Sequence, residues 1–193
     1  MDKIVIASKN QGKIDEIKPH LSHLGFEVFS MVDFDVPDID ETGHTLKENA
    51  FIKARTVKKI TNYMVLADDS GLMCDALGGK PGVYSARYAE KGNDHANNLK
   101  LLEHMADKSN RSAKFLTVMV LIDEHEKEFM FEGTLPGYIH TALEGEEGFG
   151  YDPLFIPVGH TATLAQLGDK IKHRISHRKK ALDQVIDFLG SSK

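Results

Sequence analysis

The N-terminal segment constrains the fold most, because its hydrophobic pattern changes period across a short polar break. Residues 4–6 form an apolar, β-branched run, and the polar residues 8–12 interrupt it. Beyond the break, four apolar residues recur at helical spacing: Ile14, Ile17, Leu21 and Leu24. The pattern predicts a strand, a tight loop and a helix, a typical opening of an α/β fold.

Two more helices and a strand are predicted between about residues 45 and 106. Thr45 and Glu48 have the spacing of a capping box, so a second helix is expected to begin near Thr45. Residues 63–67 are an apolar run that leads into Asp68-Asp69-Ser70-Gly71, which predicts a strand that ends in a turn. Asp94 is expected to cap a third helix.

The second half of the chain predicts a hairpin and a final helix. Residues 115–122 and 128–132 are apolar stretches on either side of a polar segment, and residues 137–142 are expected to add a third strand. A last helix is predicted from four apolar residues on one face: Ala181, Leu182, Val185 and Leu189. The whole indicates an α/β fold with a mixed sheet, in a single domain over residues 1–193.

Charge and cysteine content exclude several classes of protein. The formal net charge is −5, so the overall field would repel nucleic acid, and no nucleic-acid partner is expected. Cys74 is the only cysteine, which excludes an internal disulfide framework and suits a reducing cytoplasm. The opening apolar run is too short for a signal peptide or a membrane span. We therefore expect a cytoplasmic protein with no membrane partner.

A phosphate-bearing ligand would need local positive charge on such an acidic chain. The loop before the first helix offers backbone N–H groups, the helix dipole and the lysine side chain of Lys13. The P-loop pattern is absent from it, and an ordinary strand-to-helix turn is the alternative interpretation. The candidate phosphate residues are Ser8, Lys9, Asn10, Gln11, Gly12 and Lys13.

Two acidic pairs are candidates for a metal site. Asp40-Glu41 and Asp68-Asp69 lie in segments expected near strand ends, and carboxylate oxygens are the ligands that Mg²⁺ prefers. Mg²⁺ usually takes only one or two carboxylates from the protein. Two solvated acidic turns are the alternative interpretation of both pairs.

Two later segments suit a nucleoside. Residues 149–152 place Phe149 and Tyr151 beside Gly150, so that a ring could stack on a purine, although core packing also explains both rings. Before the last helix, four residues combine hydrogen-bond donors with positive charge: Lys172, Ser176, His177 and Arg178. A basic, solvated helix start is the alternative there.

Six blocks in this order carry a resemblance to a known family. They are residues 7–13 (ASKNQGK), 41–50 (ETGHTLKENA), 66–72 (LADDSGL), 78–88 (GGKPGVYSARY), 148–153 (GFGYDP) and 175–178 (ISHR). Over residues 4 to about 182 the chain resembles the inosine triphosphate pyrophosphatase family, which acts on non-canonical purine triphosphates. The resemblance implies a long mixed central sheet with flanking helices, two lobes around a substrate cleft, and a homodimer.

The same resemblance implies an activity and its cofactor. It implies Mg²⁺-dependent hydrolysis of ITP, dITP and XTP to the monophosphate and pyrophosphate, which cleanses the nucleotide pool. Little covalent work by the protein is needed in such a reaction, because positioning and charge neutralisation dominate phosphoryl transfer.

Roles for individual residues also follow from the resemblance. Asp69 is expected to bind the metal or to act as the base toward water, with Asp40 or Glu41 supporting the metal. The family more often has two glutamates where this chain has Asp40-Glu41, which leaves open the carboxylate that serves. The expected substrate contacts are residues 8–13, Lys53, Ser70, Phe149, Gly150, Tyr151, Asp152, Lys172, His177 and Arg178.

Two other functions stay open at this point. One is a related pyrophosphatase directed at modified pyrimidine nucleotides, which the Ser-His-Arg block disfavours. The other is a nucleotide-binding module without catalytic activity. Release of phosphate products from ITP in the presence of Mg²⁺ would separate the enzyme from the binding module.

Overall fold

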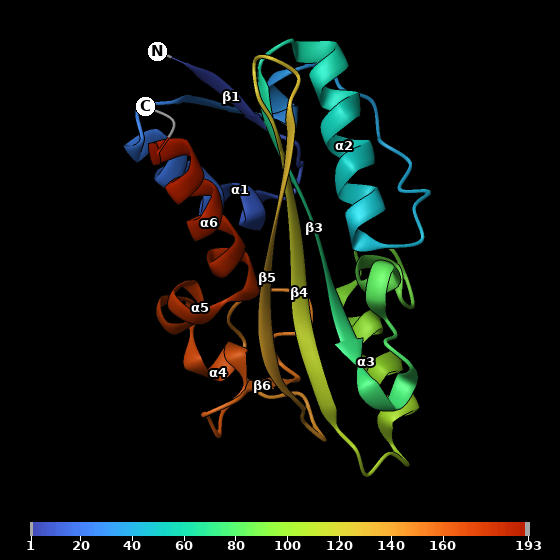
Figure 1. The fold of residues 1–193 in the computed structure, drawn as a ribbon. Helices are drawn as coiled ribbons and strands as arrows, with labels where there is room; N and C mark the ends of the chain where they lie inside the picture. The colour runs from blue at the N-terminus through green and yellow to red at the C-terminus, as the bar shows by residue number, and fades with distance from the viewer. Residues whose placement is uncertain (1, 192–193) are drawn as a thin grey trace. The chain divides into compact units, whose positions relative to one another are not determined.

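The computed structural model describes residues 2–191, which form six strands and six α-helices (Figure 1). The strands are β1 (Lys3–Ile6), β2 (Glu27–Ser30), β3 (Met64–Cys74), β4 (Ser112–Ile122), β5 (Glu128–Ile139) and β6 (Phe155–Pro157). The helices are α1 (Gln11–His23), α2 (Leu46–Thr61), α3 (Asp94–Met105), α4 (Leu164–Leu167), α5 (Asp169–Ile175) and α6 (His177–Ser191). Short 3₁₀ turns occur at Met31–Asp33, Asp75–Leu77 and Gly82–Arg87.

The strands form a mixed sheet in the order β2-β1-β3-β4-β5-β6. β1 is parallel to both of its neighbours, with Ile4 opposite Val28 of β2 and Met64 of β3. β5 and β6 are antiparallel, with Tyr138 opposite Ile156. Parallel neighbours follow from the helical connection between β1 and β2, whereas β4 and β5 are joined by a short turn. The predicted α/β fold with a long mixed sheet and flanking helices is therefore confirmed.

The chain divides into two compact units. Unit 1 comprises the residues up to Asp69, Thr117–Gly133 and the residues from Lys179 onward. Unit 2 comprises Ser70–Leu116 and Thr134–Arg178. The middle strands β3, β4 and β5 each pass from one unit into the other, so each unit is built from several separate pieces of chain.

Unit 1 is a sheet covered by helices on both faces (Figure 1). α1 and α6 share one hydrophobic cluster with β1 and β3, to which Ile4, Ile17 and Leu66 contribute, together with Val185 of α6. Side chains alternate along a strand, so Val5 faces the opposite side, where α2 lies. The predicted inward residues of the first and last helices are buried, except that Leu24 follows the end of α1 and is only partly buried.

Unit 2 has a core of its own. It is made by α3, α4, the parts of β3, β4 and β5 that belong to unit 2, and the segment before β6. Phe115 and Phe155 pack with ring centroids 4.6 Å apart, and Tyr151 and Leu154 join them in the same cluster. Within residues 2–191, no helix has both the length and the apolar character that crossing a membrane requires.

Three expectations about the elements were wrong. β3 does not end at Asp68 but continues through Asp68-Asp69-Ser70-Gly71 to Cys74. The segment from residue 137 is not a separate strand, because β5 continues to Ile139. The cap of α3 is Asn93, whose side chain accepts a hydrogen bond from the Ala96 amide, and Asp94 is the first helical residue.

Candidate functional site

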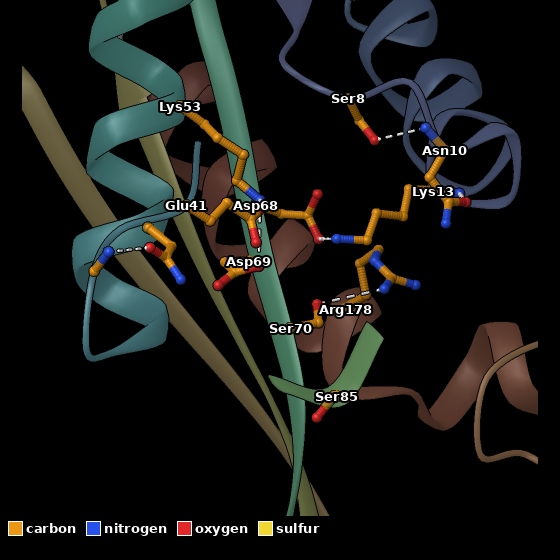
Figure 2. A network of polar contacts seen from close by, with 12 residues as sticks. Ser8, Asn10, Lys13, Glu41, Lys53, Asp68, Asp69, Ser70, Ser85 and Arg178 are labelled. Atoms are coloured by element: carbon orange, nitrogen blue, oxygen red, sulfur yellow. Dashed lines mark hydrogen bonds and ion pairs between the residues drawn. The ribbon is translucent and has the colours of Figure 1, made fainter. Parts of the chain in front are cut away.

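Two consecutive aspartates in β3 are each held by a lysine from a different helix of unit 1 (Figure 2). Lys13 of α1 places its Nζ 2.8 Å from Asp68 Oδ2, and Lys53 of α2 places its Nζ 3.2 Å from Asp69 Oδ1. Consecutive strand residues point to opposite faces of a sheet. The alternation therefore sends one carboxylate toward α1 and the other toward α2. Both aspartates are buried, which a strand accommodates because each charge has a cationic partner.

Local hydrogen bonds position Lys13. The Asn10 side chain caps α1 by accepting from the Lys13 amide at 3.2 Å, and the Asn10 amide donates to Ser8 Oγ at 3.0 Å. Lys13 thus lies in the first turn of α1, where the helix dipole favours an anion. Two other residues of the predicted phosphate loop make contacts at the surface: Lys9 pairs with Asp38, and Gln11 bonds to Asp15.

Lys53 joins two carboxylates in a compact cluster. Its Nζ lies 3.0 Å from Glu41 Oε1 as well as 3.2 Å from Asp69 Oδ1. Burial opposes the charge on Lys53, but Asp69, Asp68 and Glu41 together raise its pKa above the ordinary value. Burial also raises the pKa of Asp69, and the nearby lysines only partly offset this. A buried carboxyl whose pKa is raised is a candidate general base.

The loop that carries Glu41 is anchored to the N-terminus of α2. Thr45 caps the helix by accepting from the Glu48 amide at 3.1 Å, as predicted. The Glu48 side chain accepts from the His44 amide at 2.6 Å, and Asn49 Oδ1 accepts from the Gly43 amide at 2.8 Å. These bonds fix the loop just after Glu41.

The two members of the acidic pair in that loop differ. Glu41 is half-buried and contacts Lys53, whereas the side chain of Asp40 is exposed. This difference favours Glu41 over Asp40 as the carboxylate that acts together with Asp69.

The donor set suits a hard cation that is shared with a ligand. Among residues 2–191 there is no group of three or more His, Cys, Asp or Glu side chains that could hold a metal ion alone. However, Glu41 and Asp69 converge on one ammonium group, and Asp69 Oδ2 is buried without a hydrogen-bond partner among the described residues. One or two carboxylates completed by phosphate oxygens is the usual Mg²⁺ arrangement. Glu41 and Asp69 therefore fit Mg²⁺ bound together with a phosphate ligand.

Unit 2 brings cations to an aromatic ring. Lys172 of α5 has its Nζ 4.0 Å from the centroid of Phe149, and Arg178 Cζ lies 5.7 Å from it. Asp152 Oδ2 accepts from Lys172 Nζ at 2.6 Å and from the Phe149 amide at 2.9 Å. Asp152 thus positions both the ring and the cation. A Cβ at Gly148 would lie 2.1 Å from the same carboxylate oxygen, and its φ of +80° also requires glycine.

The other predicted residues of the last block meet at the junction of α5 and α6. Ser176 is the C-cap of α5, and His177 and Arg178 are the first residues of α6. The His177 ring stacks on Phe115 at 4.7 Å between centroids, and Arg178 Nη2 donates to Ser70 Oγ at 3.4 Å (Figure 2). Both His177 and Arg178 are buried, so a solvated helix start is excluded.

The two rings of residues 149–152 have different surroundings. Tyr151 is buried in the core of unit 2, and its hydroxyl donates to the Ser85 carbonyl at 2.7 Å. Core packing is therefore the correct interpretation for Tyr151. Phe149 is only half-buried and faces the cations, so its ring has a surface to offer a ligand.

The profile of the Ham1 family matches residues 4–188. The chain belongs to the Ham1 family. It is 45% identical to the dITP/XTP pyrophosphatase of Bacillus licheniformis over 100% of both chains, and 44% identical to that of Oceanobacillus iheyensis over 98% of both. The solved structure of the Staphylococcus aureus Ham1 protein superposes with a TM-score of 0.92 at 40% identity, covering 100% of each chain.

Some contacts in this Ham1 chain were not anticipated from its sequence. Asp94 and Asn98 of α3 both bond to Gly150, and Asp68 was not assigned a partner. The only signal for the first contact was a pair of adjacent asparagines, Asn97 and Asn98, in a predicted helix where asparagine is a poor helix former. That signal marks an unusual position but does not identify what it contacts.

Proposed function

We propose that this chain hydrolyses non-canonical purine nucleoside triphosphates, namely ITP, dITP and XTP, to the monophosphate and pyrophosphate. The observation that carries the proposal is the Glu41–Lys53–Asp69 cluster. Beside it, Lys13 forms an ion pair with Asp68, the neighbour of Asp69 in β3. It combines carboxylates and ammonium groups that suit a polyphosphate. Full-length relatives named dITP/XTP pyrophosphatase support the substrate class.

Asp69 is the proposed catalytic residue. Burial raises its pKa, so the carboxylate is a better proton acceptor than an exposed aspartate. It would either take a proton from the water that attacks the α-phosphorus or serve that attack as a ligand of Mg²⁺, while pyrophosphate leaves with the electron pair of the α–β phosphoanhydride bond. Lys13 and Lys53 would neutralise phosphate charge, because both ammonium groups lie beside β3.

Mg²⁺ is the proposed cofactor, held by Glu41 and Asp69, with Asp40 as a neighbouring acidic group. When bound together with the triphosphate, it would neutralise charge on the phosphate oxygens. The N-terminal segment would bind phosphate oxygens through backbone and side-chain donors: Ser8, Lys9, Asn10, Gln11 and Gly12.

The nucleoside is assigned to groups of unit 2. Phe149 is the proposed stacking surface, and Lys172, His177 and Arg178 are the proposed donors to the base. Ser70 and Gly150 complete the proposed substrate contacts, and the other two residues expected from the family resemblance were Tyr151 and Asp152. Tyr151 and Asp152 are buried by protein groups, so we assign them to holding the segment in place.

A homodimer in the cytoplasm completes the proposal. The family resemblance supports the dimer, and the lone, buried Cys74 suits a reducing compartment. Light scattering coupled to size-exclusion chromatography would give the mass in solution. A mass of one chain would reject the dimer without affecting the proposed reaction.

The decisive experiment is incubation of the purified protein with ITP, with and without Mg²⁺. Ion-exchange chromatography should show inosine monophosphate and pyrophosphate in equal amounts, and EDTA should abolish both products. Binding of ITP without products would instead indicate a nucleotide-binding module, and faster turnover of a modified pyrimidine triphosphate would indicate the pyrimidine-directed alternative. Full turnover in EDTA would remove the role of Glu41 and Asp69 in holding a metal.

A further inference from the structure

Helix α3 holds the nucleoside segment at one residue, Gly150. Asp94 Oδ2 accepts from the Gly150 amide at 2.7 Å, and Asn98 Nδ2 donates to the Gly150 carbonyl at 2.8 Å. Asp94 and Asn98 are four residues apart and so share one face of α3. One helix face therefore holds both backbone polar groups of Gly150, one as acceptor and the other as donor.

Gly150 follows Phe149 directly and has an unusual backbone conformation. Its φ is +62°, a left-handed conformation that favours glycine. On one side, the Phe149 amide is held by Asp152, and on the other side the Tyr151 hydroxyl is held by Ser85. The bonds from α3 fix the backbone between these two anchors. Without them, the segment could turn at Gly150 and move Phe149 relative to Lys172 and Arg178.

Asparagine is an unfavourable residue for the buried position 98 in a helix. Asparagine is a poor helix former, and this one is 2% exposed in the interior of α3. Its Nδ2 also donates to the Asp94 carbonyl at 2.7 Å, whereas its buried Oδ1 has no hydrogen-bond partner among residues 2–191. A leucine or alanine would serve the helix better. The contact outside α3 that asparagine adds is the bond to Gly150.

We propose that Asp94 and Asn98 are positioning residues that set the selectivity of the enzyme for its base. They hold Gly150, and through it they hold the Phe149 ring against Lys172 and Arg178. The inference rests on the proposed function, because the base is taken as the ligand of this group. Neither residue touches the base in this scheme, and both act through the backbone of Gly150.

Asn97 supplies a matched control. It is the neighbour of Asn98 in α3, it is also 2% exposed, and its side chain also holds backbone groups of a loop. Its Oδ1 accepts from the Ala89 amide at 2.6 Å and from the Glu90 amide at 3.0 Å. Truncation of either asparagine removes a buried amide from the same helix, but only Asn98 contacts the nucleoside segment.

The first test measures kcat/KM for ITP and for ATP in wild type and variants. Asn98→Ala should lower kcat/KM for ITP by about 10- to 100-fold, the scale of a small misplacement at a reacting complex, and should shrink the ITP/ATP ratio. Asn97→Ala should leave the ratio within about twofold of wild type. Asp94→Ala, at an exposed position that tolerates substitution, should repeat the loss, and Asp94→Asn should restore most of it because an acceptor oxygen remains.

The second test needs no ligand. Hydrogen–deuterium exchange should show faster exchange of peptides that cover residues 148–152 in Asn98→Ala and Asp94→Ala, and of residues 86–90 in Asn97→Ala. Unchanged exchange at residues 148–152 would overturn the positioning role alone. The same conclusion would follow if wild type prefers ITP to ATP and the ratio is unchanged in Asn98→Ala and Asp94→Ala. A wild type that does not discriminate ITP from ATP would overturn the proposed base assignment itself.

Discussion

Asp68 and Asp69 are adjacent in sequence but have different partners, since a strand turns consecutive side chains to opposite faces. Asp68 pairs with Lys13 in the first turn of α1, while Asp69 shares Lys53 with Glu41. Asp68 therefore positions the ammonium group of Lys13 near a helix N-terminus. The second contact brings the carboxylates of Asp69 and Glu41 together at Lys53. Substitutions of the two aspartates are therefore expected to affect different kinetic parameters.

Asp69→Asn should lower kcat by roughly 10²-fold or more, because the amide can neither accept the proton nor hold a cation as a carboxylate does. Asp68→Asn should act mainly on KM, since it alters the pairing of Lys13 and leaves Asp69 in place. Steady-state kinetics with ITP would measure both parameters. A large kcat loss in Asp68→Asn with a mild effect in Asp69→Asn would reverse the assignment within the pair.

Elements show which parts of the fold a sequence can predict. The start of α2 was predicted correctly because a cap depends on residues three positions apart, Thr45 and Glu48. The course of β3 was not, because aspartates are rare in strands and the lysines that compensate them come from other helices. Likewise, Asn98 and Gly150 are 52 residues apart, so no local pattern brings them together.

A second prediction concerns how α2 is tied to β5. Arg55 donates from Nε and Nη2 to the two carboxylate oxygens of Glu128 at 2.7 and 2.8 Å. These hydrogen bonds lower the pKa of Glu128 below its ordinary value of 4.5. Because the folded pKa is depressed, the stabilisation is present above about pH 4.5 and is lost as pH falls through the lower, folded pKa. The pair is largely exposed, so its contribution at neutral pH should be about 0.2–1 kcal/mol.

Urea unfolding of wild type, Glu128→Gln, Arg55→Met and the double variant at neutral pH and near pH 3 would isolate the pair. The double-mutant cycle removes the separate contribution of Arg55 packing over the Phe51 ring. The coupling free energy should be measurable at neutral pH and smaller near pH 3. A coupling that grows on acidification would contradict the assigned sign of the pKa shift.

The charge of the whole molecule also shapes its chemistry. A net charge of −5 repels polyanions at long range, so a triphosphate depends on the few cations placed at the candidate site. Composition predicted this need, and the family blocks named most of the residues that we propose to meet it. The pairing of those residues could not be predicted, because the N-terminal helix, α2 and β3 meet only through tertiary packing.

At the scale of the whole enzyme, the groups that we assign to the base predict selectivity for 6-oxo purines. In their charged forms, Lys172, His177 and Arg178 are hydrogen-bond donors only. The O6 of hypoxanthine or xanthine accepts such bonds, whereas the 6-amino group of adenine would set donor against donor and leave desolvated groups unsatisfied. Such a polar mismatch can discriminate by about 10⁴-fold, so ATP should be a very poor substrate.

Guanine shares O6, so its rejection must depend on the 2-amino group, and GTP should be disfavoured less sharply than ATP. Arg178→Ala should lower kcat/KM for ITP much more than for ATP, because it removes a buried donor that only the 6-oxo base can use. Steady-state assays with ITP, GTP and ATP would measure the ratios.

Comparable kcat/KM values for ITP and ATP in wild type would reject this assignment of the base. An unchanged ratio in Arg178→Ala would assign discrimination to Lys172 and His177 instead, since these are the other two donors beside the Phe149 and Phe115 rings.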